Sequence, residues 1–236
     1  MTADSVNAGA AHRVRLSLVI PVLNEAQGIV AALQDLAMLR AAGAEVIVVD
    51  GGSSDATREL CAGLADQVLL RPRGRARQMN FGAARAGGPA LLFLHADTRL
   101  PADALGCVQR ALDSGHDWGR FDVRIEGRSA LFPVISWFMN WRSRLSGIAT
   151  GDQAIFVRRE VFEALGGFPD QPLMEDIELS KRLRKLGRPA CLTQRVVTSG
   201  RRWERDGVGR TILLMWRLRF LYSIGVSAQQ LAKAYR

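Results

Sequence analysis

The chain has 236 residues, of which 48% are hydrophobic and 23% are charged, and its formal net charge at pH 7 is +9. This length and composition predict one substantial folded domain with a small appendage, and they exclude a disordered or fibrous protein. No apolar run reaches the ~20 residues that span a bilayer. We expect no nucleic-acid partner, because no helix-turn-helix, zinc-ligand or RNA-binding pattern accompanies the arginines. Polyanionic small substrates and an anionic membrane surface remain as partners for the positive charge.

Strand and helix patterns alternate through the first half of the chain. Short apolar runs predict strands at 16–20, 45–49, 68–70 and 91–94. Helical spacing of apolar residues and turn signals predict helices at 29–40, 56–62, 74–86 and 103–112. This alternation is typical of βαβ units, so we predict an α/β fold with a mostly parallel sheet flanked by helices.

The pattern becomes less regular in the second half. We predict strands at 117–126 and 153–157 and helices at 175–186 and 206–222. The expected division is a domain over 15–205 followed by a C-terminal helical extension over 206–236. Residues 1–14 lack the apolar segment of a signal peptide and are expected to be a disordered lead-in. Three cysteines without a CxxC pair favour a reducing, cytoplasmic location.

Two acids directly follow predicted strands. Asp97 comes after the strand at 91–94, and Asp50 after the strand at 45–49. Ligands of open α/β sheets bind beyond the carboxyl ends of the strands, where Asp97 could hold a divalent cation and the cation could hold phosphates. Asp50 could accept a nucleobase N–H or a ribose hydroxyl. The alternatives are structural, a helix N-cap for Asp97 and a strand–helix turn for the segment that Asp50 begins.

Other polar groups have two interpretations each. Glu175 and Asp176 could supply a general base, or they could simply favour the start of a helix. His95 could contact a ribose or support a metal, or it could be a half-buried structural histidine. The segment Gly151-Asp152-Gln153 could face an acceptor or be a turn. The four arginines in 71–77 could reach a diphosphate or form a solvated face, and Arg202-Trp203 suits an anionic group with a stacked ring.

The segments 131–148 and 206–226 combine aromatic residues, leucines and arginines. One interpretation is that they pack on the domain or on a second subunit, which would make a homodimer. The alternative is an interfacial surface that meets a lipid-linked acceptor at the inner face of the membrane, because basic amphipathic helices bind anionic lipid.

The order of these motifs resembles family 2 glycosyltransferases of the GT-A (Rossmann-like) fold. The similarity runs from about Leu16 to Trp203, through Pro21-Val-Leu-Asn-Glu25, Val49-Asp50-Gly-Gly-Ser-Ser-Asp55, Gly74 to Gly82, His95-Ala-Asp97 and Glu175-Asp176. Three fuller strings are similar to a bacterial subgroup described as radical-SAM/selenodomain-associated glycosyltransferases: Gly74-Arg-Ala-Arg-Gln-Met-Asn80, Gly151-Asp-Gln-Ala-Ile-Phe-Val157 and Pro172-Leu-Met-Glu-Asp176.

The resemblance implies an inverting transfer of a sugar from a nucleoside diphosphate donor, a UDP- or GDP-sugar, to a hydroxyl acceptor. It implies Asp176 as the catalytic base with Glu175 beside it, and Asp97 as the ligand of Mg²⁺ or Mn²⁺. Together with the residues themselves, it predicts a donor site of Pro21, Glu25, Asp50, Gly52, Arg77, His95 and Asp97. The predicted acceptor site consists of Gly151, Asp152, Gln153, Arg202 and Trp203.

Two positions depart from the family pattern. His95 stands where the first acid of the DxD motif is expected, which leaves Asp97 as the protein ligand for a metal. Ser199 stands where processive relatives have a glutamine, so we infer no processivity. The alternatives to the transferase are a nucleotidyltransferase and a sugar-nucleotide-binding or scaffold protein without catalysis. A nucleotidyltransferase would carry a Gly-rich loop with Arg and Lys after the first strand, and Pro21-Val-Leu-Asn-Glu25 is not such a loop.

Overall fold

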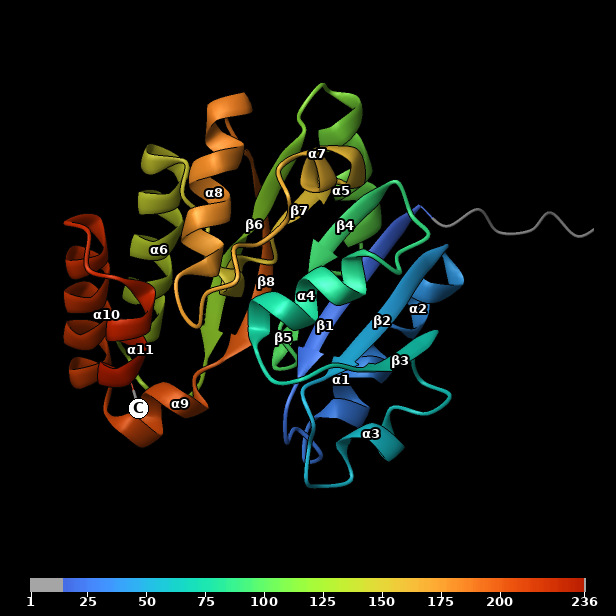
Figure 1. Cartoon of the computed structure of the whole chain (residues 1–236), viewed down its shortest axis with the longest axis horizontal. Coiled ribbons are helices and arrows are strands. Elements are labelled where there is room, and N and C mark those ends of the chain that lie inside the picture. The colour runs from blue at the N-terminus through green and yellow to red at the C-terminus, as the bar shows by residue number, and fades with distance from the viewer. Residues whose placement is uncertain (1–14, 236) are drawn as a thin grey trace, which may run out of the picture.

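The computed structural model describes residues 15–235, so the expected lead-in at 1–14 lies outside the described residues. An eight-stranded sheet runs through the molecule in the order β3-β2-β1-β4-β7-β6-β8-β5 (Figure 1). The strands are β1 (Leu16–Val22), β2 (Ala44–Asp50), β3 (Gln67–Leu70), β4 (Ala90–Phe93), β5 (Thr98–Arg99), β6 (Trp118–Glu126), β7 (Phe156–Arg158) and β8 (Ala190–Ser199).

Four neighbouring strands, β3, β2, β1 and β4, are parallel, as the alternating pattern predicted. β7 is antiparallel to both β4 and β6, while β8 is parallel to β6 and antiparallel to β5. Because the first four strands point the same way, their carboxyl ends lie at one edge of the sheet. The loops that carry the candidate site begin at that edge.

Helices cover both faces of this sheet (Figure 1). Their bounds are α1 (Ile29–Asp35), α2 (Ala37–Ala41), α3 (Thr57–Leu60), α4 (Arg75–Ala83), α5 (Ala104–Asp113), α6 (Phe132–Ser146), the 3-10 helix η1 (Gly151–Gln153), α7 (Arg159–Ala164), α8 (Glu175–Leu186), α9 (Arg201–Asp206), α10 (Val208–Ser223) and α11 (Ala228–Ala234).

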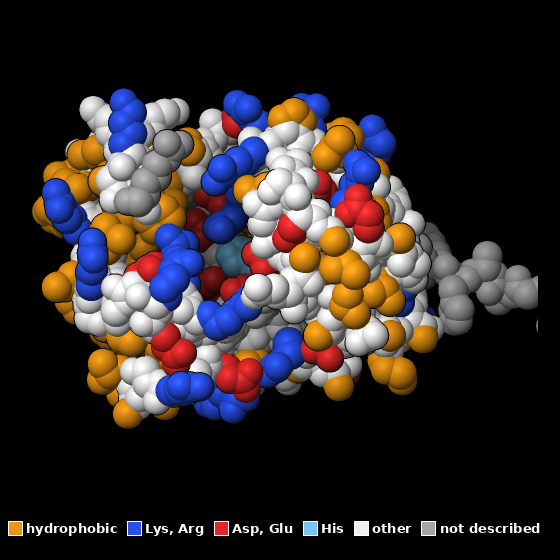
Figure 2. All heavy atoms as spheres, turned by 90° about the horizontal axis from the view of Figure 1, so that it is seen from below, with side chains coloured by type: hydrophobic (Ala, Val, Ile, Leu, Met, Phe, Trp, Pro, Cys, Tyr) orange, Lys and Arg blue, Asp and Glu red, His pale blue; other side chains and the backbone are white. Residues whose placement is uncertain are grey.

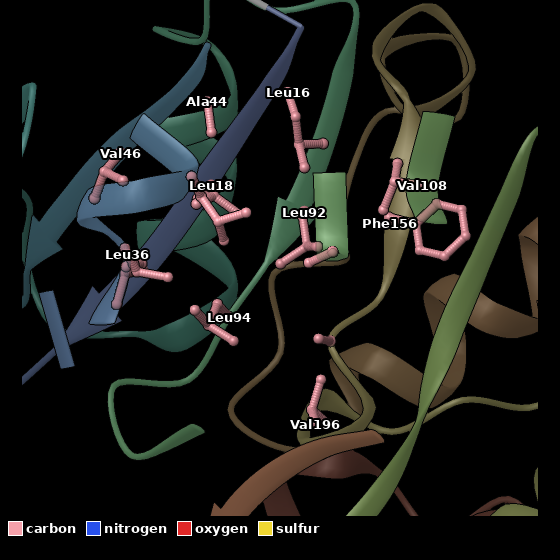
Figure 3. Close-up of a cluster of buried hydrophobic side chains, with 14 of the residues drawn as sticks. Leu16, Leu18, Leu36, Ala44, Val46, Leu92, Leu94, Val108, Phe156 and Val196 are labelled. Atoms are coloured by element: carbon pink, nitrogen blue, oxygen red, sulfur yellow. The ribbon is translucent and has the colours of Figure 1, made fainter. Parts of the chain in front are cut away.

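The central strands are buried on both faces, so their side chains alternate between two cores. Leu16, Leu18 and Leu92 point to a core shared with α1, α2 and α5, and Figure 3 shows them together with Val46 and Phe156. Val19, Ile47 and Leu91 belong to the opposite core, which α4, α7 and α8 complete. This double burial explains why the strands are continuous apolar runs in the sequence.

The structure departs from the predicted elements in several places. The helix predicted at 29–40 is divided at Leu36, and the strand predicted at 153–157 starts only at Phe156 because η1 precedes it. The pattern also missed β8, whose middle residues Gln194 and Arg195 are exposed beside an irregularity in β6. Their exposure removes the apolar alternation by which a strand is found in a sequence. The elements β5, α7, α9 and α11 were missed as well.

The C-terminal helices pack on the start of α8 through a small cluster. Its buried members are Met174, Ile177, Leu218 and Leu231. α10 buries only Thr211 and Leu218, so most of its apolar side chains are not used in this packing. Among helices within residues 15–235, none has both the length and the hydropathy that a bilayer crossing requires.

The aromatic segments pack on the domain through their inner faces only, so packing on a second subunit and contact with a membrane stay predictions for their outer faces. α6 exposes Trp137 and Trp141, and α10 exposes Trp216 and Phe220, each by 47% or more. The inner face of α6 instead presents polar side chains to β6, where Ser136 and the Asn140 side chain bond its backbone. These small polar groups replace the apolar packing that the composition suggested, and the aromatic side chains turn outward.

Candidate functional site

A cleft of about 720 Å³ opens at the edge of the sheet where β1 and β4 end. Figure 2 shows this side of the molecule hollowed, with a histidine side chain inside the hollow and acidic and basic side chains around it. Asp97 and Asp176 both line the cleft, although 79 positions separate them in the sequence (176 − 97). The predicted metal ligand and the predicted base are therefore brought together.

Hydrogen bonds fix the two loops that follow β1 and β2 to one another. The Asn24 backbone N–H donates to the Ser53 hydroxyl, and the Ser54 N–H donates to the Asn24 side chain. The Glu25 N–H donates to the Thr57 hydroxyl at 2.8 Å. These bonds explain why the segment from Asp50 to Asp55 is rich in serine and aspartate, and they hold Glu25 at the cleft.

Asp176 is oriented by two backbone groups. Its Oδ2 accepts the Gly151 N–H at 2.8 Å, and its Oδ1 accepts the Ile177 N–H at 2.7 Å. Each carboxylate oxygen has a second lone pair, so both can still accept a proton or a hydroxyl. The carboxylate is half-buried at the cleft wall, which suits a group that must receive a proton from a bound alcohol.

Glu175 is more deeply buried than Asp176 and faces a basic partner. Only 4% of the residue is exposed, and its carboxylate lies 3.6 Å from the Arg75 guanidinium. Burial raises the pKa of Glu175, the adjacent Asp176 raises it further, and Arg75 opposes both. Glu175 therefore positions Arg75, and Asp176 is the acid with the freer carboxylate.

Arg75, at the start of α4, is the arginine of the 71–77 run that reaches the cleft. The charges of Glu175, Asp176 and Asp152 raise its pKa against the effect of burial, so it stays a cation. Arg77, the arginine predicted for the donor site, does not line the cleft and instead pairs with Asp170 at 2.8 Å. Residues two apart on a helix point to different sides, so only one of these arginines can face the cleft.

His95 is held between two residues of η1. Its Nδ1 lies 3.2 Å from the Asp152 carboxylate, and a Cβ built on Gly151 would lie 2.4 Å from its Nε2. Position 151 therefore has room only for glycine while the imidazole keeps this place. Burial acts to raise the pKa of Asp152, but His95, Arg75 and Arg202 outweigh it and lower this pKa.

Asp97 and Glu25 form the acidic part of the cleft. Asp97 is exposed, and within residues 15–235 no ion pair includes it. Partial burial raises the pKa of Glu25, and the nearby Asp97 raises it further. The described residues contain no group of three His, Cys, Asp or Glu side chains able to hold a metal ion. A single unpaired carboxylate nevertheless fits Mg²⁺ or Mn²⁺ that is held mainly by substrate phosphates and water.

Arg202 and Trp203 line the cleft from α9, as the resemblance implied. The Arg202 guanidinium lies 4.3 Å from the centre of the Tyr235 ring, which also borders the cleft. Tyr235 was not predicted as a site residue, because it follows α11, a helix that the periodicity did not reveal. Arg202 is thus placed by an aromatic face that comes from the end of the chain.

Four predicted site residues lie outside the cleft lining: Asp50, Gly52, Arg77 and Gln153. The Asp50 carboxylate is buried and accepts bonds from the backbone N–H groups of Gly52 and Ser53 in its own loop. Gln153 is also buried, and its side chain accepts the Thr150 N–H. Their roles toward a ligand remain predictions.

Backbone strain is concentrated beside this site. Among residues 15–235, the non-glycine residues with positive φ are Asn24, Ala154 and Met174. Asn24 precedes Glu25, Ala154 follows η1, and Met174 precedes Glu175. Such conformations are costly and persist at places where the surroundings fix them, often at functional sites.

Comparison with known sequences gives a family match. A model described as glycosyl transferase family 2 matches residues 17–166. The succinoglycan biosynthesis protein ExoA of Rhizobium meliloti (strain 1021) is 30% identical over 199 residues, which cover 75% of this chain and 60% of ExoA. The probable glycosyltransferase YdaM of Bacillus subtilis (strain 168) is 26% identical, with 77% of this chain and 47% of YdaM covered. The chain thus spans about three fifths of the length of ExoA and about half of the length of YdaM.

Solved structures share the fold. The mannosyltransferase PcManGT from Pyrobaculum calidifontis, in complex with GDP-Man and Mn²⁺, matches 79% of this chain and 57% of its own with a TM-score of 0.60 and 23% identity. S. aureus TarS 1-349 in complex with UDP matches 79% of this chain and 60% of its own with a TM-score of 0.61 and 18% identity. These similarities confirm the predicted α/β GT-A-like fold.

Proposed function

The chain belongs to glycosyltransferase family 2, and from this premise we propose that it transfers a sugar, with inversion, from a UDP- or GDP-sugar to a hydroxyl acceptor. The observation that carries the proposal is the placement of Asp97 and Asp176 on one cleft. In this proposal Asp97 faces the donor phosphates and Asp176 faces the acceptor. The structural neighbours that bind GDP-Man with Mn²⁺ and UDP support both the donor class and the use of a divalent cation.

In this mechanism Asp176 takes the proton of the acceptor hydroxyl. The hydroxyl oxygen forms a bond to the anomeric carbon while the bond from that carbon to the diphosphate oxygen breaks, so the configuration inverts. The Gly151 and Ile177 N–H groups hold the Asp176 carboxylate in place during this step. A bound Mg²⁺ or Mn²⁺ would neutralise charge on the departing diphosphate. Asp97 is the residue that would hold this cation.

The basic side chains of the cleft have a second part in the proposal. Arg75 and Arg202 line the same cleft as Asp97 and bring positive charge to a site that must accept a diphosphate. Because His95 replaces an acid of the DxD motif, the protein offers the cation one carboxylate fewer. The arginines then supply part of the positive charge that the diphosphate needs. The finer resemblance to the radical-SAM/selenodomain-associated subgroup is part of the proposal too, and it rests on the strings around Gly74, Gly151 and Pro172.

A thermal-shift comparison of nucleotides tests the donor class. We expect UDP or GDP with Mn²⁺ to raise the melting temperature, since a ligand at 100 times its Kd stabilises by ~2.7 kcal/mol. The corresponding nucleoside monophosphate is the control and should give a smaller shift. Absence of a shift with every nucleoside diphosphate would contradict the proposed donor site. Binding without any donor hydrolysis or transfer would favour the non-catalytic alternative.

We further propose that the exposed faces of α6 and α10 contact an anionic membrane, where a lipid-linked acceptor would be found. Apolar side chains recur on one side of each helix, and the Phe138 and Trp216 rings, 6.2 Å apart, join the two sides. Figure 2 shows apolar side chains gathered at the left end of the molecule, where α6 and α10 lie in Figure 1. Exposed Arg217 adds positive charge to α10, and an apolar face with basic residues beside it favours anionic lipid.

Flotation with vesicles tests the membrane proposal. We expect the chain to float with phosphatidylglycerol-containing vesicles and much less with pure phosphatidylcholine. Replacing Trp216 and Phe220 together by serine should weaken binding about tenfold or more, because burying each such side chain contributes ~1.5–3 kcal/mol. Met38→Ser removes an exposed apolar side chain from α2 and serves as the control. Equal flotation of all variants, or a dimer that the double substitution dissociates, would contradict the proposal.

A further inference from the structure

Two arginines from different helices lie near Asp176 without an acidic partner. Arg219 of α10 lines the cleft, and the Nη2 atom of Arg142 on α6 is buried without a hydrogen-bond partner. Within residues 15–235, no ion pair includes either guanidinium. Both groups are close enough to Asp176 for its charge to act on their pKa values.

The acids around this pair are already engaged. The two oxygens of Asp122 are taken by Arg120 and Arg144. The two oxygens of Asp176 accept backbone N–H groups, as described above. Within residues 15–235 neither arginine therefore forms an ion pair or a direct hydrogen bond with an acid, although the charge of Asp176 acts on both. The two guanidiniums lie about one helical turn beyond the contacting rings of Phe138 and Trp216 on neighbouring helices.

This arrangement is costly without a ligand. Burial and the charge of Arg219 lower the pKa of Arg142 to about 10, so the group remains a cation at neutral pH. Burial lowers the pKa of Arg219 as well. Buried charges in proteins are normally paired or hydrogen-bonded, and an unpaired buried donor costs free energy that a bound anion would recover.

We propose that Arg142 and Arg219 bind a phosphate group of the acceptor, an inference that rests on the transferase function proposed above. A guanidinium presents a planar fork of N–H donors that matches phosphate oxygens, and two guanidiniums side by side favour a doubly charged group. The site lies next to Asp176, so the hydroxyl that loses its proton belongs to the same phosphate-bearing molecule. The sugar acceptor is therefore a phosphate ester.

The neighbouring aromatic side chains indicate which kind of ester fits. Phe138 precedes Arg142 by one helical turn on α6, and Trp216 precedes Arg219 by about one turn on α10. Their rings contact each other at the exposed surface. A phosphate bound to the two arginines is thus placed beside an apolar surface that can take a hydrocarbon chain.

Calorimetric binding of two phosphate probes tests this inference. The donor site is first saturated with Mn²⁺ and the nucleoside diphosphate that gives the larger thermal shift, so that the probes cannot bind there. Inorganic phosphate and octyl phosphate, the latter below its micelle concentration, are then titrated into the wild type, Arg142→Gln, Arg219→Gln and Arg210→Gln. Arg210 is the matched control because it is exposed, lies on α10 like Arg219 and does not line the cleft.

We expect Arg142→Gln and Arg219→Gln each to weaken phosphate binding about tenfold or more, since a hydrogen bond to a charged group contributes ~1.5–3 kcal/mol. Arg210→Gln should bind like the wild type, and all four proteins should keep the same affinity for the nucleotide. Octyl phosphate that binds more tightly than inorganic phosphate identifies a lipid-type acceptor. Equal affinities identify a small phosphate ester.

Several outcomes would overturn the inference. One is a wild type that binds nucleotide but neither phosphate probe, and another is phosphate binding that both glutamine variants retain. A wild type that binds no nucleotide would instead contradict the proposed function. Removing one of two neighbouring positive charges should leave the ligand-free melting temperature unchanged or raise it. A lower melting temperature in both glutamine variants would show that the arginines are structural.

Discussion

Asp176→Asn is expected to lower the rate of donor turnover by about 10²–10⁴-fold, the range that general base catalysis contributes. The substitution keeps the size of the side chain but removes the group that takes the proton from the acceptor. Donor affinity should stay within about twofold of the wild type, because Asp176 acts on the acceptor and not on the diphosphate. Release of the nucleoside diphosphate measures the rate, with water as the acceptor when no alcohol is known.

Asp170→Asn is the matched control for this experiment. Asp170 also lies close to the start of α8 in the sequence, but its carboxylate is at the surface and pairs with Arg77. The control should turn over like the wild type, and both variants should unfold at temperatures close to that of the wild type. An active Asp176→Asn enzyme would show that another group takes the proton, and Glu175 would be the next candidate to test.

The two acids proposed for the site could be predicted from the sequence because each has a recognisable place beside an element. Asp97 comes directly after a buried apolar run, and Asp176 is in the first turn of an amphipathic helix. The rule that parallel strands end at one edge then brings Asp97 to the ligand side of the sheet. No sequence pattern predicts that Asp97 and Asp176 line the same cleft, because this depends on how η1 and α8 pack beyond the parallel strands.

Arg75 shows where sequence reasoning stopped short. The four arginines in 71–77 carry the same charge, and they differ in where their side chains point. The direction follows from the phase of α4, in which Arg75 precedes the buried Met79 and Gly82 by four and seven residues. This phase was available from the helical spacing, but the prediction selected Arg77 from the run. The structure replaces that choice with the arginine that contacts Glu175.

Arg142 and Arg219 could not be identified from the sequence at all. Both lie in segments rich in aromatic residues and arginines, where a solvated face is the ordinary expectation. Their partial burial depends on the packing of α6 beside α10, and residues 147–207 separate these two helices in the sequence. A contact of this kind follows from tertiary packing and has no local periodicity.

Asp97→Ala is expected to remove the dependence of donor binding on a divalent cation. In the wild type, Mn²⁺ should tighten the binding of the preferred nucleoside diphosphate by at least about tenfold, equivalent to ~1.4 kcal/mol. The alanine variant should lose this increment, because Asp97 is the exposed cleft carboxylate that is proposed to hold the cation. Calorimetry with Mn²⁺ and with EDTA measures both affinities for each protein.

The direction in which Asp97→Ala changes nucleotide affinity in the absence of metal makes this test more specific than a measured loss of activity. Asp97 is exposed, has no basic partner among residues 15–235, and lies close enough to Glu25 to raise the pKa of that carboxyl. Its negative charge therefore repels a diphosphate when no cation is present, so in EDTA the alanine variant should bind the nucleotide as tightly as the wild type or more tightly. Asp113→Ala, on the surface of α5, is the control and should behave as the wild type in both conditions. If Mn²⁺ tightened binding equally in all three proteins, the cation would have to be held by another residue, and the replacement of the first DxD acid by His95 would then need a different explanation.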